Sequence, residues 1–278
     1  MNTHQKAKRF QALHARPGAF VIPNPWDVGT ARILAGLGFE ALTTTSAALS
    51  FTLGKRDGDG SVTRDETLAN ARMVVEATEL PVAADLENGF GDAPEVVAET
   101  IRLAAAIGLV GGSIEDATGD PARPIYDVAH AVERIAAAAE AACALPFPFM
   151  LVGRAEGLRF GQPDLDDIIR RLQAFEAAGA DVLYAPGLRR AEDIRTVCAS
   201  VTRPVNVVMG LGRMEGPPLS VADLAALGVR RISVGSALSR AALGAFVRAA
   251  EEIRDQGTFA FAADAIPMAR AIELVTRT

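Results

Sequence analysis

Residues 82–116 run VAADLENGFGDAPEVVAETIRLAAAIGLVGGSIED, and this stretch decides the fold class. The apolar runs at residues 82–85 and 111–115 have the length and composition of buried strands, while residues 93–107 place apolar side chains at helical spacing. A strand, a helix and a second strand in this order form a crossover between two parallel strands. The stretch therefore predicts a parallel sheet with helices packed against it.

The same alternation continues in both directions along the chain. It gives eight candidate strands, at residues 19–22, 41–45, 82–85, 111–115, 149–154, 182–184, 205–208 and 231–234. Helical patterns lie between them, at residues 65–78, 93–107, 126–144, 164–178, 191–200 and 221–227. Glycines just before the next strand indicate left-handed C-caps that turn the chain back, as at Gly38, Gly179 and Gly228.

Eight parallel strands with crossover helices close most simply into a (β/α)8 TIM barrel, an α/β fold that often reaches this length as one unit. We therefore expect residues 1–278 to form a single barrel domain. An open doubly wound sheet is the alternative. The absence of a G-x-G-x-x-G motif after the first strand weakens that alternative.

The composition argues against several classes of protein. Half of the 278 residues are hydrophobic and 22% are charged, which suits one large buried core. The net charge is -6 and the basic residues form no patch, so we expect no nucleic-acid partner. Apolar stretches such as residues 103–112 are far shorter than the roughly 20 residues that cross a bilayer. Residues 1–16 lack the apolar core of a signal peptide, so we expect a cytoplasmic protein without membrane contact.

Reactive side chains other than carboxylates are scarce. They comprise Cys143 and Cys198, Lys6, Lys8 and Lys55, and His4, His14 and His130. The cysteines lie in helical stretches and are expected to be buried structural thiols, with neither disulfide nor zinc implied. No lysine lies at a strand end, which leaves no amine for a Schiff base, and the histidines are expected to be satisfied surface residues. Acid–base chemistry is thereby left to carboxylates, Tyr184 or the loop after the second strand.

Two segments fall outside the barrel pattern. Residues 46–64 form a long connection that contains Leu53-Gly54-Lys55-Arg56-Asp57-Gly58-Asp59-Gly60, too glycine-rich and charged for a helix, and it is typical of a mobile lid. Residues 240–278 form a C-terminal helical extension, with a helix pattern at 240–255 and an apolar segment at 259–278. Because a barrel needs no further helix, we expect this extension to pack on a neighbouring subunit.

In such a barrel the active site is built at the C-terminal ends of the strands. Asp85 and Glu87 follow the third strand and Glu115 ends the fourth, so three carboxylates converge that could not all stay ionised without a compensating cation. A hard divalent ion, Mg²⁺ or Mn²⁺, meets that need and keeps several waters, so some carboxylates would act through water. The alternative is that one or two of them cap helices or pair with arginines.

Arg154 ends the fifth strand, and its guanidinium can bind a carboxylate or phosphonate with two hydrogen bonds. The alternative is a buried ion pair with Glu156 or Glu115. The backbone amides of residues 46–48 are candidate donors to the same anion. We expect the substrate to be bound by residues that follow the strands: Trp26, Thr45, Ser46, Ala47, Ala48, Arg154 and Tyr184.

Asp57 and Asp59 lie on the predicted lid, where closure would desolvate them beside the substrate and raise their basicity. The alternative is a solvated turn, since Asp-Gly pairs are common in turns. Asp57 is the stronger of the two, and we predict Asp57 and Arg154 as the catalytic residues.

The motifs at these positions resemble those of the phosphoenolpyruvate mutase/isocitrate lyase superfamily, from about residue 20 to residue 261. They are Asn24-Pro25-Trp26-Asp27, Leu53-Gly54-Lys55-Arg56-Asp57, Asp85-Leu86-Glu87-Asn88-Gly89-Phe90-Gly91, Ser113-Ile114-Glu115-Asp116 and Arg154-Ala155-Glu156. The resemblance implies Mg²⁺ surrounded by Asp85, Glu87 and Glu115, directly or through water, and substrate binding by Arg154. It also implies a homotetramer in which the last helix is exchanged between paired subunits.

The metal loop and the lid depart from the patterns of this superfamily. Glu87 stands where the D-x-D-x-G-x-G element has its second Asp, which lengthens one arm and keeps its charge. The gating-loop Asp of the mutase and phosphonopyruvate hydrolase branch falls on Asp57, but the Asn-Asn-Glu that follows it there is replaced by Gly58-Asp59-Gly60. The lyase motif K-[KR]-C-G-H is also absent, so neither branch is matched in full.

The leading hypothesis is a lyase- or mutase-type enzyme that cleaves or forms a carbon–carbon or carbon–phosphorus bond at C3 of a small 2-oxo acid, with Mg²⁺ and Arg154 stabilising the enolate. A 2-methylisocitrate lyase-like enzyme is an alternative. A second hypothesis is an enzyme or binding module for a phosphorylated metabolite, held by Gly210-Leu211-Gly212 and Gly235-Ser236. A third is a catalytically silent homologue that binds a 2-oxo acid.

Overall fold

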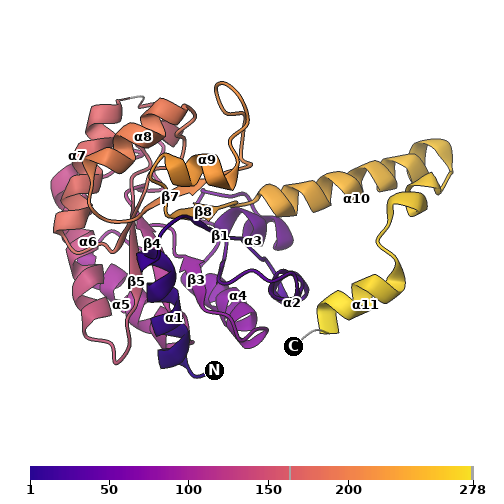
Figure 1. Ribbon diagram of the computed structural model, residues 1–278, viewed down its shortest axis with the longest axis horizontal. Helices are drawn as coiled ribbons and strands as arrows, with labels where there is room; N and C mark the ends of the chain where they lie inside the picture. Colours follow the sequence, from indigo (N-terminus) through magenta and orange to yellow (C-terminus); the bar gives the residue numbers. More distant parts are fainter. Residues whose placement is uncertain (163, 277–278) are drawn as a thin grey trace.

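The computed structural model describes residues 1–162 and 164–276, and its centre is a barrel of eight parallel strands (Figure 1). The strands are β1 (Phe20–Ile22), β2 (Leu42–Thr43), β3 (Val82–Asp85), β4 (Gly111–Glu115), β5 (Met150–Arg154), β6 (Val182–Tyr184), β7 (Val205–Val208) and β8 (Arg231–Ser233). They pair in the order β1-β8-β7-β6-β5-β4-β3-β2, and the backbone N–H of Thr43 donates to the carbonyl of Pro23 at 3.1 Å across the remaining gap. The predicted TIM barrel is confirmed, and the open doubly wound sheet is excluded.

Helices form the outer layer of the barrel. They are α1 (Thr3–Ala15), α2 (Val28–Gly36), α3 (Ser46–Thr52), α4 (Arg64–Glu76), α5 (Pro94–Ala106), α6 (Val128–Cys143), α7 (Leu165–Ala177), α8 (Ala191–Ser200), α9 (Val221–Ala226), α10 (Ala237–Gln256) and α11 (Met268–Thr276), with 3-10 turns η1 (Gly157–Phe160) and η2 (Ala260–Asp264). Thr63 and Glu66 form a capping box at the start of α4, because each side chain accepts the other's backbone N–H. Gly179 and Gly228 follow α7 and α9 with φ of 106° and 102°, the left-handed conformation that returns the chain to the next strand.

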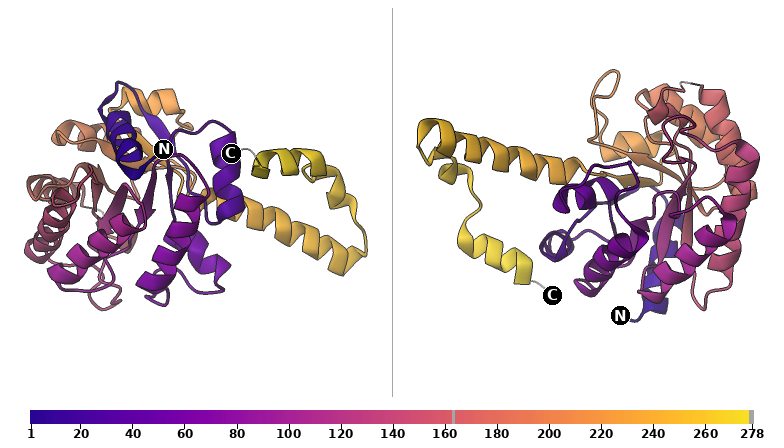
Figure 2. Two further views of the ribbon diagram at one scale, coloured as in Figure 1. Left: turned by 90° about the horizontal axis from the view of Figure 1, so that it is seen from below. Right: turned by 180° about the vertical axis from the view of Figure 1, so that it is seen from behind.

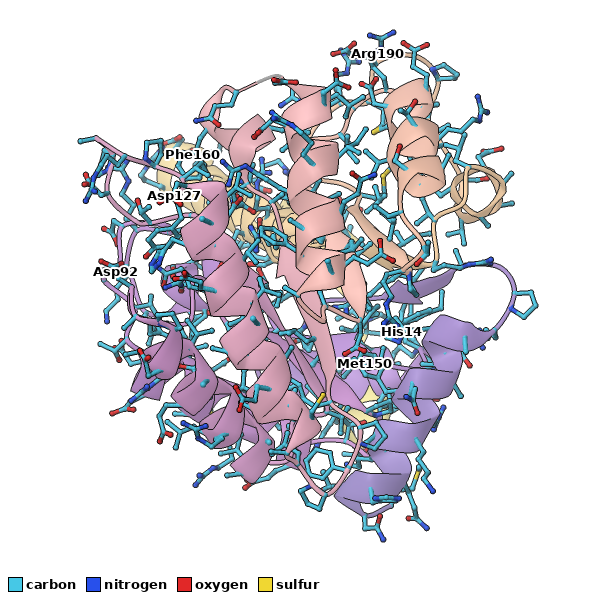
Figure 3. All side chains as sticks on the ribbon, turned by 90° about the vertical axis from the view of Figure 1, so that its left-hand side faces the viewer. His14, Asp92, Asp127, Met150, Phe160 and Arg190 are labelled. Atoms are coloured by element: carbon cyan, nitrogen blue, oxygen red, sulfur yellow. The ribbon has the colours of Figure 1, made fainter. Side chains whose placement is uncertain are left out.

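Helix α1 closes the bottom of the barrel, which no pattern in the sequence indicated. Its Phe10 is fully buried and packs with inward-facing strand residues such as Phe20 and Met150. His14, expected at the surface, is only 4% exposed, because its ring packs edge-on against Phe10 and Phe20. Figure 3 shows His14 and Met150 at one end of the barrel, with Phe160 and Arg190 toward the other. The barrel therefore has a closed floor, and its mouth lies at the C-terminal ends of the strands.

Two further expectations about local structure are wrong. The connection at residues 46–64 begins with helix α3, whose Ala48 and Leu49 are buried, so the irregular part is residues 53–63, called the lid loop below. Cys143 is exposed because it lies in the last turn of α6, whereas Cys198 is partly buried and burial raises the pKa of its thiol to about 11.

The C-terminal extension leaves the barrel. Figures 1 and 2 show α10 projecting outward and the chain then turning back, so that α11 lies beside α2. The extension carries a series of exposed large apolar side chains: Leu238, Leu243, Phe246, Val247, Ile253, Phe259, Ile266, Met268 and Ile272. Within the described residues, no helix combines the length and the apolar character needed to cross a membrane.

Candidate active site

Two adjoining cavities open at the mouth of the barrel. One, of about 580 Å³, runs down the inside of the barrel and is lined by residues of β2 to β8, and the other, of about 860 Å³, lies beside the ends of β3 and β4. Four residues line both cavities: Ser46, Asp57, Arg154 and Arg159. The lid loop therefore contributes Asp57 to the point where the two cavities meet.

Two of the predicted carboxylates, those of Asp85 and Glu115, contact one guanidinium at this point. Nη1 of Arg154 lies 3.1 Å from a carboxylate oxygen of Glu115 and 3.4 Å from one of Asp85. Asp85 also accepts a hydrogen bond of 2.9 Å from the Ser46 hydroxyl. The position of Arg154 follows from the register of the barrel, which places Glu115 beside it on the neighbouring strand.

One guanidinium does not neutralise this cluster, as the shifts in pKa indicate. Desolvation, followed by the charges of Asp85 and Asp57, raises the pKa of Glu87 to about 8. Desolvation also raises the pKa of Glu115 well above its usual value, and it raises the pKa of Asp57, with a further contribution from Asp85. Of these four carboxylates, Asp85 alone has a lowered pKa, because Arg154 and the Ser46 hydroxyl outweigh the effect of its burial. The site therefore holds more carboxylates than its own cations can keep ionised.

The loop after β3 holds its acids in an unusual backbone conformation. Glu87 and Phe90 have φ of 48° and 65°, in the left-handed region that side chains other than glycine rarely adopt. Arg134 holds this loop from α6: its Nη1 donates to the carbonyl of Gly91 at 2.6 Å, and its Nη2 donates to that of Asn88. We therefore infer that Arg134, 1% exposed, positions the acidic loop.

Sequence reasoning missed Arg134. A possible signal was its core-facing place in α6, among buried residues such as Ala131, Ile135 and Ala138. An arginine on an apolar helix face requires buried acceptors nearby, which here are backbone carbonyls.

A network of ion pairs on the side of Arg154 away from Asp85 and Glu115 holds its guanidinium in place. Nε of Arg154 pairs with Glu156, which is fully buried and also pairs with Arg159 at 3.1 Å. The backbone N–H of Glu156 donates to Asp116 at 2.7 Å, and Asp116 pairs with Arg171 at 3.1 Å. The alternative reading of Arg154 as an ion-pair partner of Glu156 and Glu115 is thus present in the structure. Its Nη1 nevertheless faces the cavity acids, so the ion pair fixes the guanidinium at the site.

The donor set suits a hydrated divalent cation. Acids outnumber arginines around the 860 Å³ cavity, which is lined by Asp57, Asp65, Glu87, Asp92, Glu95, Glu99 and Glu115 against Arg64, Arg154 and Arg159. In the part of the chain that the structure describes, no three His, Cys, Asp or Glu side chains form a group that could hold a metal ion by themselves. Mg²⁺ commonly binds through one or two carboxylates and completes its octahedron with water and substrate. The residues therefore fit an ion that is only partly held by protein atoms.

The other predicted binding residues divide into two groups. Thr45, Ser46, Ala47 and Tyr184 line the 580 Å³ cavity, and the ring of Tyr184 lies 5.1 Å from the guanidinium carbon of Arg154. Trp26 and Ala48 do not line either cavity, because Ala48 packs into the core with α3 and Trp26 lies beside α2 and α4, where its carbonyl accepts from Asn70.

Two smaller predictions concern Asp59 and the glycine-rich loops. Asp59 is exposed and accepts from the backbone N–H of Ser61 at 2.9 Å, which is the solvated turn considered as its alternative. The proposed phosphate cradle, Gly210, Gly212, Gly235 and Ser236, lines the opposite wall of the 580 Å³ cavity from the acidic cluster.

An eight-stranded barrel with carboxylates paired to a buried arginine at its mouth is the arrangement of a known class of enzymes. The chain belongs to the phosphoenolpyruvate phosphomutase family, whose sequence model matches residues 10–254. The superfamily predicted from the motifs is thereby confirmed, and the protein is an enzyme of the lyase/mutase type.

Known proteins align over most of the chain. A Burkholderia cenocepacia protein solved as a candidate lyase/mutase is 57% identical, with a TM-score of 0.94 over 99% of this chain and 97% of that one. A 2,3-dimethylmalate lyase of the phosphoenolpyruvate mutase/isocitrate lyase superfamily is 25% identical, with a TM-score of 0.85 over 97% of this chain and 94% of that one. An oxaloacetate decarboxylase of Chromohalobacter salexigens is 28% identical over 258 residues, 91% of this chain and 86% of its own.

Proposed function

We propose that the protein is a Mg²⁺- or Mn²⁺-dependent enzyme that cleaves or forms a bond to C3 of a small 2-oxo acid by way of an enolate. The observation that carries the proposal is the pairing of Asp85 and Glu115 with Arg154, beside Asp57 and Glu87, whose pKa values are raised by desolvation and by neighbouring carboxylates. Asp85, Glu87 and Glu115 would hold the cation, some of them through water. When bound, the cation polarises the 2-oxo group and offsets the negative charge that develops on it.

The protein's own residues supply recognition and proton transfer. Arg154 binds the carboxylate of the substrate, since its guanidinium is held in place by Glu156 and faces the cavity. The backbone amide of Ala47, at the start of α3, is a further donor to the same anion, whereas the amide of Ser46 donates to Asp85 at 3.4 Å. Asp57 lies on the lid loop between the two cavities, so it can exchange a proton with C3 while the loop excludes water.

Oxaloacetate is the substrate we would test first. Cleavage of its C3–C4 bond releases carbon dioxide and leaves the electron pair on the enolate of pyruvate, which takes a proton at C3. An oxaloacetate decarboxylase among the relatives supports this choice. Phosphonopyruvate, whose carbon–phosphorus bond cleaves through the same enolate, is the second choice. The lid loop has neither the Cys nor the His of the isocitrate-type lyases, so we expect negligible cleavage of isocitrate and 2-methylisocitrate.

The test is turnover of these four compounds with Mg²⁺, monitored as pyruvate and phosphate release. Release from oxaloacetate or phosphonopyruvate supports the proposal. Efficient cleavage of isocitrate or 2-methylisocitrate would show that the lid is misassigned. Binding of a 2-oxo acid without turnover of any compound would instead favour a catalytically silent binding protein.

We also propose that the barrel and its C-terminal extension, residues 1–278, act as one unit within a homotetramer in which paired subunits exchange the end of the chain. The exposed apolar side chains of α10 and of the segment after it support this, since such patches mark protein interfaces. Phe246, 70% exposed, is the most informative position. Phe246→Glu should lower the mass measured by light scattering, and an unchanged mass would contradict the exchange.

A further inference from the structure

An arginine without a partner lies at the inner end of the 580 Å³ cavity. Arg231 begins β8, three strands from Arg154 around the barrel, and is only 5% exposed. The strand pairing places Arg154 beside Tyr184 of β6, Tyr184 beside Asn206 of β7, and Asn206 beside Arg231. Because side chains that point into a barrel converge on its axis, these residues line one continuous space.

Arg231 lacks the partners that every other buried arginine of the site possesses. Its Nε and Nη1 have no hydrogen-bond partner within the described residues, and no acid there pairs with it. Its neighbours are the ring of Phe10, 5.9 Å from the guanidinium carbon, and the uncharged ring of His14. Oδ1 of Asn206 is also unpartnered, while its Nδ2 donates to the Ser233 hydroxyl at 3.1 Å.

An unpaired buried charge is costly, and a water molecule does not neutralise it. Desolvation lowers the pKa of Arg231 to about 10, still far above neutrality, so the guanidinium remains charged at pH 7. The carboxylates of the mouth do not compensate it, because Asp85 and Glu115 already pair with Arg154. The floor of the cavity thus has an excess positive charge, with N–H donors free to bind an acceptor.

We propose that Arg231 and Ser233, whose hydroxyl is held by Asn206, form an anion subsite at the inner end of the cavity that binds a carboxylate group or a small inorganic anion. The anion accepts from the guanidinium N–H groups. The Ser233 hydroxyl, which accepts from Asn206, is free to donate its own proton to the same anion. Binding of a free anion here does not depend on the proposed reaction.

The first test is thermal melting of the metal-free protein in sodium formate, the smallest carboxylate. The ionic-strength control is a sodium salt of a bulky sulfonate that cannot enter the barrel. We expect formate to raise the melting temperature of the wild type by about 2–4 °C, the scale of tenfold saturation for a protein of this size. Arg231→Met should lose this shift, whereas Arg230→Met, which alters the adjacent arginine that does not line the cavity, should keep it. Equal responses of all three proteins would overturn the proposal.

The second test does not depend on how well a variant folds. Crystals of the wild type soaked in sodium bromide should show an anomalous peak within hydrogen-bond distance of the Arg231 guanidinium. A peak there supports the subsite. An ordered water at Arg231 with bromide bound only elsewhere would show that the subsite is hydrated and does not bind anions.

A third measurement identifies the source of the anion. If the second carboxylate of a substrate occupies the subsite, Arg231→Met should weaken oxaloacetate binding about tenfold or more and leave pyruvate binding unchanged. If a free anion occupies it, both affinities should survive while the formate response is lost. Formate binding in a protein that turns over none of the four compounds would reject the proposed function and leave the subsite standing.

Discussion

The acidic mouth of the barrel and its basic floor differ in which charge is in excess: carboxylates at the mouth, and one unpaired guanidinium at the floor. At the mouth, β3 and β4 bring Asp85 and Glu115 to Arg154 with Glu87 nearby, and the pKa values of Glu87 and Glu115 rise while that of Asp85 is lowered. At the floor, β8 holds Arg231 beside the ring of Phe10 and neutral side chains, and no acid among the described residues pairs with its guanidinium. Each end contains groups that the folded chain alone does not compensate.

This difference indicates what the cavity can bind. A metal ion at the mouth and an anion at the floor would each remove a cost that the empty protein bears. Arg154 lies between the two ends, paired with Glu115 on one side and stacked near Tyr184 on the other. A small acid with two anionic groups could bind the metal ion and Arg154 at the mouth with one group and Arg231 at the floor with the other.

Removal of the metal should have the largest effect, because it leaves the carboxylates at the mouth of the barrel without a compensating cation. Without a cation, the carboxylates of the mouth repel the enolate that the reaction forms, so we expect kcat/KM for oxaloacetate to fall about 10³-fold or more after chelation. Restored activity on addition of Mg²⁺ or Mn²⁺ is the control. Undiminished turnover, or undiminished 2-oxo acid binding by calorimetry, in the metal-free protein would refute the metal site.

Arg154→Lys tests the group that joins the two ends. Lysine keeps the charge but not the paired N–H donors that face Asp85, Glu115 and Glu156. We expect kcat/KM to fall by roughly 10²- to 10³-fold with a cooperative unfolding transition retained. Arg159→Lys is the matched control, since Arg159 pairs with the same Glu156 but is 47% exposed. A large loss of melting temperature with normal affinity would make Arg154 a structural residue only.

Asp57→Asn tests whether the lid loop supplies the acid–base group of the active site. Asn has nearly the same shape but cannot exchange a proton, so kcat should fall about 10²-fold while substrate affinity changes little. Asp59→Asn is the control, because Asp59 is exposed on the same loop and bonds only within it. Normal turnover by Asp57→Asn would assign the proton transfer to another group.

The smallest effect concerns His14, on the floor beside Arg231. Burial, and then the charge of Arg231, lower the pKa of His14 to about 3 from its usual 6.5. The unfolded chain therefore takes up a proton that the folded protein does not, and the unfolding free energy falls as the pH decreases from 6.5 toward 3.

His14→Gln removes this titration. Between pH 7.5 and 5.5, we expect the wild type to lose about 1 kcal/mol more stability than the variant in urea unfolding. Parallel pH dependences would show that His14 is already free to protonate in the folded protein.

The mouth of the cavity was more predictable than its floor. Asp85, Glu87, Glu115 and Arg154 were found because strand ends in a barrel share one edge, so position along the sequence indicates position in space. Arg134 and Arg231 were missed, because one lies in the middle of a helix and the other at the start of a strand. The only local signal was the place of Arg134 on the apolar face of its helix, and the start of a barrel strand is not where an active site is expected.

The sequence by itself determined the order of strands and helices, their caps and the acids that follow β3 and β4. These features depend on residue spacing and local hydrogen bonds, which neighbouring residues control. Only the tertiary structure decided that α1 closes the floor, that Trp26 and Ala48 do not line the cavities, and that Arg231 is buried without an acid. Pairing and burial depend on contacts between residues far apart in the chain, so they follow from the closed barrel and from no single segment.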